Sequence, residues 1–271
     1  MRRLLFPALT CALLAPGAWA LDCPQPLRIG FGDRATPPVL LGQGPTFAEP
    51  PGWSVAAVRE ALHRIGCSAE LLRLPRRRLN AALANGEVQF ALLYGPSPQR
   101  LRAFSFPLDA QGRPDTAWAP VFGHMALYGR AGTVPDAAWN GVDLPPGLRV
   151  GVLAGSVQEV LAGQRGWAVE PILNPDGEVA MLLAQRFDLL LTVREGLTPE
   201  QRALLVEWAP LAAWQPYFAP AAQAFMQRHG RWTRAFWAEF CHAVRRLEPD
   251  ARPVDCGQSL PSPPPQVRLE R

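Results

Sequence analysis

Residues 74–108 read LPRRRLNAALANGEVQFALLYGPSPQRLRAFSFPL, and this stretch decides the fold. Asn85-Gly86 ends a helix, because glycine is the usual residue just past a helix C-terminus. The next run, Val88 to Tyr94, is mostly apolar, as expected for a strand covered on both faces of a sheet. The loop that follows carries Arg100, just past the carboxyl end of that strand, where open α/β sheets bind ligands. The stretch therefore predicts an α/β fold with a ligand site at Arg100.

The residues before and within this stretch form a strand–helix–strand–helix–strand unit. Short apolar runs predict the strands, and apolar residues spaced along one face predict the helices. Such a unit implies a parallel sheet with right-handed crossovers. The expected strands are Leu27–Gly32, Ala69–Leu74 and a third from Val88, and the expected helices are Trp53–Ile65 and Arg76–Asn85.

The same alternation starts again near residue 148. The second set repeats the first, which predicts two α/β lobes. That two crossing segments join the lobes, with a ligand cleft between them, is what the family resemblance given below implies. The second set has expected strands at Leu148–Leu153, Ala168–Leu173 and Phe187–Val193, and helices from Gly155-Ser156 to about Ala162 and at Asp176–Gln185. The crossings are expected at Met125–Arg130 and near Ala213–Ala219, and closing helices at Ala221–His229 and Trp232–Leu247.

The pattern also suggests a division of the chain. Lobe 1 would take residues 21–127 and 213–248, with lobe 2 formed by 128–212. Residues 249–271 include PSPPPQ and are too rich in proline to form a packed element, so we expect a tail without fixed structure.

The first 20 residues have the pattern of a secretion signal. Arg2 and Arg3 precede an apolar run that is too short to span a membrane, and Ala18-Trp19-Ala20 is a cleavage site. No other stretch approaches the roughly 20 apolar residues of a membrane span. We therefore expect cleavage after Ala20 and a soluble product in the periplasm.

Composition excludes several classes of function. The formal net charge is +4 and includes Arg2 and Arg3. This excess of positive charge is too small to indicate nucleic-acid binding. The chain has no lysine, and Schiff-base chemistry needs a lysine amine. The four histidines are scattered, without H-x-x-x-H, C-x-x-C, G-x-S-x-G or a P-loop. We expect no cofactor, no metal and no enzyme activity.

Four cysteines follow the signal, and an even count in an exported chain suggests disulfides. Three pairings are possible, and free buried thiols are the alternative. We favour Cys23–Cys67 because each precedes a strand, and those strands, if neighbours, bring both cysteines to one sheet edge. The second favoured pair is Cys241–Cys256, since the chain can fold back past the last helix.

The order of motifs, namely an apolar strand, then Ser-Pro-Gln-Arg at 97–100, then Phe-Ser-Phe-Pro at 104–107, resembles the periplasmic solute-binding proteins of the polar amino-acid type (bacterial extracellular solute-binding protein family 3). The resemblance covers most of the mature chain. It implies a two-lobe periplasmic-binding-protein fold and delivery of a small solute to an ABC-type permease.

The resemblance assigns Arg100 to the α-carboxylate of the ligand, with Ser97 as an additional donor. A guanidinium matches a carboxylate with two parallel hydrogen bonds. Gly155 and Ser156 resemble the family's helix start in lobe 2, whose free N–H groups can bind an anion. For Arg100 the alternative is a surface arginine paired near Asp109, and for Ser156 it is an ordinary helix cap.

Asp33 and Tyr94 lie at or beyond strand ends and are further pocket candidates, as are residues near Thr192. The family pattern breaks at Val193, where amino-acid binders usually place the Asp that pairs with the ligand's ammonium group. An acid without an ammonium group fits as well. The basic run from Arg76 to Arg78 opposes the helix macrodipole and indicates either an anion nearby or a solvated helix start.

We therefore predict an exported, monomeric solute-binding protein that captures a small carboxylate-bearing solute, anionic at one end, in an interlobe cleft. Two alternatives stay open. One is a dehydratase- or lyase-like cleft enzyme, for which Glu159 and Glu195 are the candidate acid–base pair. The other is a degenerate binding protein or sensor that acts through a protein partner, which the departures at Val193 and Gln89 favour slightly.

Overall fold

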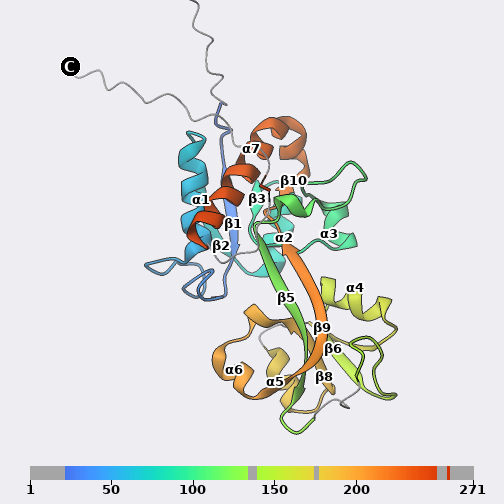
Figure 1. Cartoon of the computed structure of the whole chain (residues 1–271). Helices are drawn as coiled ribbons and strands as arrows, with labels where there is room; N and C mark the ends of the chain where they lie inside the picture. The colour runs from blue at the N-terminus through green and yellow to red at the C-terminus, as the bar shows by residue number, and fades with distance from the viewer. Residues whose placement is uncertain (1–21, 134–138, 174–176, 249–254, 257–271) are drawn as a thin grey trace, which may run out of the picture.

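A computed structural model describes residues 22–133, 139–173, 177–248 and 255–256. Two α/β lobes each surround one five-stranded sheet, with strand orders β2-β1-β3-β10-β4 and β7-β6-β8-β5-β9. Figure 1 shows the two lobes with the long strands β5 and β9 running between them. The chain therefore has the predicted two-lobe fold with two crossings.

The first lobe combines the N-terminal part of the chain with its last helix. Strand β1 pairs in parallel with β2 and β3, and β10 lies antiparallel between β3 and β4. The elements of this lobe are β1 (Arg28–Gly32), α1 (Trp53–Arg64), β2 (Glu70–Leu74), α2 (Arg76–Ala84), β3 (Phe90–Ala91), α3 (Pro98–Ala103), β4 (Phe104–Ser105), the short helix η1 (Thr116–Trp118), β10 (Ala221–Ala222) and α7 (Gln223–Leu247).

The second lobe comes from one continuous stretch. Strand β6 pairs in parallel with β7 and β8, and β5 pairs antiparallel with both β8 and β9. The elements are β5 (Val121–Arg130), β6 (Arg149–Leu153), α4 (Val157–Gln164), β7 (Ala168–Ile172), α5 (Glu178–Leu183), β8 (Leu189–Val193), the short helix η3 (Arg194–Gly196), α6 (Pro199–Ala203) and β9 (Leu205–Tyr217).

The third strand of lobe 1 is shorter than predicted. The apolar run from Val88 to Tyr94 is buried almost throughout, but only Phe90–Ala91 form regular strand. Leu93 has a φ of 59°, which breaks the extended backbone, and Tyr94 makes an isolated bridge to Phe218. Apolar periodicity detects burial, and it does not detect this local turn.

The closing segment consists of two helices that meet at a kink, as expected from the sequence. Helix α7 runs from Gln223 to Leu247, with non-helical angles only at His229 (φ −127°, ψ 35°). Its aromatic side chains pack against the sheet at Phe90, whose ring lies 4.5 Å from Phe236 and 5.5 Å from Phe225. This burial holds both halves of α7 on lobe 1.

Gln89, one of the departures from the family pattern, has a structural role. Its Oε1 accepts a hydrogen bond from the Arg28 N–H at 2.7 Å, and its Nε2 donates to the Gly86 carbonyl. In lobe 2, the Asp188 carboxylate accepts from the Arg149 N–H in the same way at 2.9 Å. The amide at 89 thus ties the start of its strand to the neighbouring strand as the carboxylate does.

The predicted disulfides are confirmed. Cys23 is bonded to Cys67, and Cys241 to Cys256. The first ties the N-terminal segment to the turn before β2, and the second ties α7 to the residue at 256.

The proposed signal peptide at 1–20 lies outside the described residues, as does most of the tail at 249–271. Within the described part of the chain, no helix combines the length and apolar character that crossing a membrane requires.

Gly151 in β6 leaves room for the Phe187 ring. A Cβ at this position would lie 2.4 Å from Phe187 Cζ, and Phe187 is fully buried. We expect Gly151→Ala to lower the free energy of unfolding by about 1–3 kcal/mol through overpacking. Gly163→Ala in α4 is the matched control, because nothing lies within 4 Å of its added carbon. Urea melts of the two variants check this, and equal midpoints would contradict it.

Candidate functional site

Arg100 lies just past β3, as the sequence predicts, but on the short helix α3 and not in a loop. Ser97 caps this helix by accepting a hydrogen bond from the Arg100 N–H at 3.3 Å. The Arg100 Nη1 donates to the Gly95 carbonyl at 2.8 Å, and the guanidinium carbon lies 5.1 Å from the centre of the Tyr94 ring. These contacts fix the side chain without a carboxylate within 4.0 Å among the described residues. Ser97 is accordingly a helix cap that positions Arg100.

Arg76 approaches the same aromatic ring. Its guanidinium carbon lies 4.6 Å from the Tyr94 ring centre, and its Nη2 lies 3.7 Å from the position of a Cβ on Gly32 at the end of β1. Tyr94 is buried, and its hydroxyl donates to Asn80 Oδ1 at 2.8 Å. Tyr94 thus serves as a platform for two cations, with its own polar group turned away to α2.

The lobe 2 helix start lies close to the segment of lobe 1 that carries Arg100. A Cβ on Gly155 would lie 3.5 Å from Oε1 of Gln99, the neighbour of Arg100. The Gly155 N–H, expected to bind a ligand carboxylate, instead donates to the Glu159 carboxylate at 2.7 Å. Ser156 caps α4 by accepting from the Glu159 N–H. A ligand anion can reach the Gly155 N–H only if Glu159 moves.

Thr192, at the end of β8, contacts Glu178 at the start of α5. The Thr192 hydroxyl donates to Glu178 Oε1 at 3.2 Å, and both side chains lie near the cleft edge of the lobe 2 sheet. Burial raises the pKa of Glu178, while the Thr192 hydrogen bond and the positive charge of Arg34 in lobe 1 lower it in part. Arg34 and Glu178 therefore bring opposite charges near one another from the two lobes.

The raised pKa of Glu178 gives a signed prediction for pH. A carboxyl whose pKa is higher in the folded state binds more protons there, so its contribution to stability falls as pH rises above its unfolded pKa of about 4.3. Glu178→Gln keeps an acceptor for Thr192 and removes the charge. We expect the variant to gain stability relative to the wild type as pH rises from 4 to 7. Melting curves of both proteins at several pH values test this. A variant that loses stability relative to the wild type as pH rises would contradict it.

Asp33 lies in the loop after β1, close to Arg73. Its carboxylate raises the pKa of Arg73, although burial of Arg73 has the larger, lowering effect. The Asp33 backbone carbonyl also accepts from the Gly44 N–H at 2.8 Å. Asp33 thus helps to shape the 33–51 loop beside the cleft, and no direct role toward a ligand follows from its contacts.

The second crossing contributes Tyr217 and Gln215. Burial raises the pKa of Tyr217, Glu195 raises it further, and Arg76 and Arg100 lower it, which places all four groups in one neighbourhood. Gln215 is buried beside Gly95, and its Oε1 has no hydrogen-bond partner among the described residues. Glu195, two residues after Val193, accepts a hydrogen bond from the His124 N–H at 2.9 Å through one of its two carboxylate oxygens.

Some of these residues were not expected from the sequence. The basic run at 76–78 left open an anion nearby or a solvated helix start, and it did not indicate which of its arginines would reach Tyr94. Glu178 and Gln215 gave no signal, because a glutamate at a helix start and a glutamine in a strand are common in any fold. Arg73 was hidden inside an apolar strand pattern.

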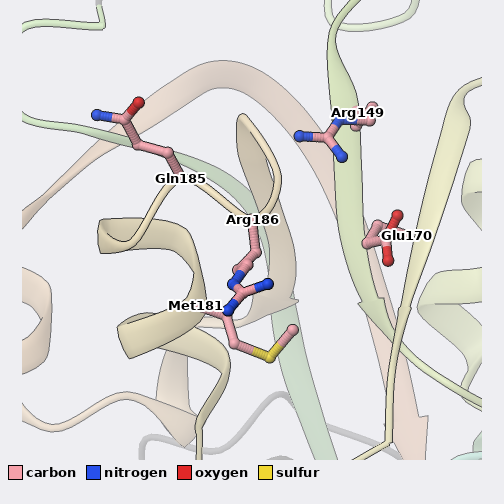
Figure 2. Close-up of a pocket in the computed structure, with 5 residues that line it drawn as sticks. All are labelled: Arg149, Glu170, Met181, Gln185 and Arg186. Carbon is pink, nitrogen blue, oxygen red and sulfur yellow. The ribbon is translucent and has the colours of Figure 1, made fainter.

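A separate hollow lies on lobe 2, away from the cleft. Figure 2 shows its lining side chains, with Arg149 and Glu170 on the strands and the others near the end of α5. Arg149 is the first residue of β6, so the hollow lies at the opposite end of the sheet from Gly155. Its charges are mixed, and Arg149 already lies 3.8 Å from Asp188. The residues that line the hollow are Arg149, Glu170, Met181, Gln185 and Arg186.

No protein-family model and no curated protein sequence matches this chain. Solved structures share its fold. The ligand-binding core of GluR0 from Nostoc punctiforme, in complex with L-glutamate, is 15% identical, with a TM-score of 0.55 over 83% of this chain and 94% of that one. A histidine kinase sensor domain with similarity to periplasmic binding proteins is 19% identical, with a TM-score of 0.58 over 85% and 93%.

A third structure is the ancestral amino-acid-binding protein AncCDT-1, a precursor of cyclohexadienyl dehydratase. It is 14% identical, with a TM-score of 0.58 over 83% of this chain and 94% of that one. Together with the strand orders of the two sheets, these similarities define the class of the fold as periplasmic-binding-protein-like.

Proposed function

We propose that this chain is an exported solute-binding protein that captures a small carboxylate-bearing solute, an amino acid or related organic acid, between its two lobes. Arg100 holds the carboxylate from lobe 1. Closure of the lobes about β5 and β9 encloses the solute. The protein acts in the periplasm as a monomer and passes the solute to an ABC-type permease.

One observation carries this proposal. Arg100 is held by Gly95 and Tyr94 at the carboxyl edge of the lobe 1 sheet, next to the Gln99–Gly155 contact that joins the lobes. No carboxylate of the described residues forms an ion pair with it. A guanidinium that is positioned by neutral groups keeps its charge available for a ligand. Its N–H donors are also spaced to match the two oxygens of a carboxylate. Two of the structural neighbours are described as binding L-glutamate or amino acids.

The enzyme alternative gains little from the geometry. Both candidate carboxylates accept hydrogen bonds from backbone N–H groups, Glu159 from Gly155 and Glu195 from His124. A general acid or base must be free to reach a substrate proton. A sensory role through a protein partner is the second candidate, because one structural neighbour is the sensor domain of a histidine kinase.

A thermal-shift screen of the mature, disulfide-bonded protein tests the proposal. The library contains amino acids, keto acids, monocarboxylates, dicarboxylates and small aromatic acids. A ligand at 100 times its dissociation constant stabilises the folded state by about 2.7 kcal/mol, which gives a clear shift of the melting temperature. If no compound shifts the melting temperature, the solute-binding role is refuted and a partner search is the next step.

A further inference from the structure

The charges on the two sides of the cleft are unequal. On the lobe 1 side, Arg76 and Arg100 both approach Tyr94, and neither forms an ion pair with a carboxylate in the described part of the chain. Arg76 is exposed and Arg100 is half-buried, so both can be reached by a solute. The positive end of α2, at which Arg76 lies, adds to the same potential.

Two like charges on one ring oppose each other. Burial lowers the pKa of Arg100, and the charge of Arg76 lowers it further. Each contact of a guanidinium with the ring face offsets part of this repulsion. A bound ligand whose two acidic groups reach the two guanidinium groups offsets this repulsion.

Three carboxylates near the proposed site each accept a hydrogen bond from the protein. Glu159 accepts from the Gly155 N–H, Glu195 accepts from the His124 N–H, and Glu178 accepts from Thr192 beside the charge of Arg34. The end of β8 is apolar at Val193, which is buried. The end of β8, where amino-acid binders usually place an Asp for the ligand's ammonium group, therefore offers no carboxylate at position 193.

We propose that the cleft is selective for a small dicarboxylate without an ammonium group, with one carboxylate on Arg100 and the other on Arg76. This inference rests on the proposed solute-binding role and specifies its ligand class. Each carboxylate accepts charge-assisted hydrogen bonds from one guanidinium. The distance between the two acidic groups then selects the chain length of the solute.

Isothermal titration with matched acids tests the proposal. The probes are succinate, glutarate and adipate, the monocarboxylate butyrate, and glutamate, which is glutarate with an added ammonium group. For the best chain length, we expect the dicarboxylate to bind at least about 30-fold more tightly than butyrate, since a charge-assisted pair contributes about 2 kcal/mol or more. Glutarate should also bind more tightly than glutamate.

The variant Arg76→Gln separates the two carboxylate positions. It should weaken dicarboxylate binding about 30-fold and leave butyrate binding within about 3-fold. Arg77→Gln is the control, because Arg77 is exposed on the same helix and has no ion pair in the described residues. Equal melting temperatures of the two variants show that both are folded.

The outcomes separate this inference from the proposed function. If amino acids or monocarboxylates bind as tightly as dicarboxylates, or if Arg76→Gln binds dicarboxylates as the wild type does, the dicarboxylate assignment is overturned while the solute-binding role stands. Absence of binding by every probe in the full library overturns both.

Discussion

Arg100→Ala should abolish detectable solute binding, with a loss of affinity of about 100-fold or more. Removing one partner of a charge pair in a binding site costs about 2–5 kcal/mol, and each 1.4 kcal/mol is a factor of ten. The free protein should lose little stability, because the described side chain makes one hydrogen bond, to Gly95. Titration of the ligand found by the screen measures the change.

Arg102→Ala is the matched control for this variant. Arg102 lies on the same helix, is exposed, and has no side-chain ion pair in the described residues. It should bind the ligand as the wild type does. Arg100→Lys should lie between the two, since lysine keeps the charge and loses the forked geometry. If Arg100→Ala retains affinity within about 3-fold, the carboxylate is held elsewhere and the proposed site is wrong.

Arg73→Met should lower the free energy of unfolding by about 3–5 kcal/mol. The Arg73 side chain is only 3% exposed and donates to four backbone carbonyls, at distances from 2.7 to 3.2 Å. Methionine fills the space but leaves these acceptors unpaired, and each buried unpaired group costs about 1–3 kcal/mol. The acceptors belong to Gly32, Leu41, Gly42 and Thr46.

Urea unfolding measures the effect of this substitution. Arg59→Met is the control, because Arg59 is exposed on α1 and should change stability by less than about 0.5 kcal/mol. Proteolysis should cut Arg73→Met faster within residues 33–51, the loop that the guanidinium holds. A loss below about 1 kcal/mol would mean that water satisfies the four carbonyls and that Arg73 does not organise the loop.

The fold was predictable because the same order of apolar runs and amphipathic helices occurs twice in the sequence. Two sets of apolar runs and amphipathic helices in the same order define two α/β lobes, and the rule that ligands bind past strand ends places Arg100 at the cleft. Both disulfides followed from the positions of cysteines before neighbouring strands and near the last helix. These features depend on local sequence patterns and on topology.

The details of the site were less predictable, because they depend on contacts between segments that are far apart. The Gly155 N–H can bond either to a ligand or to the protein's own Glu159 carboxylate. The Gly-Ser pattern at the helix start is the same in both cases, so the sequence does not distinguish them. The four acceptors of Arg73 come from a loop with no regular structure. By contrast, the break in the closing helix was predictable, and α7 has its kink at His229, beside Gly230, a residue that weakens helices.

The position of β10 has a consequence for the order in which the molecule assembles. Ala221 pairs with Phe90 on one side and Ser105 on the other, so residues made late in synthesis separate β3 from β4. The lobe 2 sheet needs only residues 121–217 and can form while the remainder is still being made. The lobe 1 sheet depends on contacts of long sequence separation, which form slowly. Helix α3, which carries Arg100, lies between β3 and β4 in the chain, so its final position depends on a strand near the end of the chain.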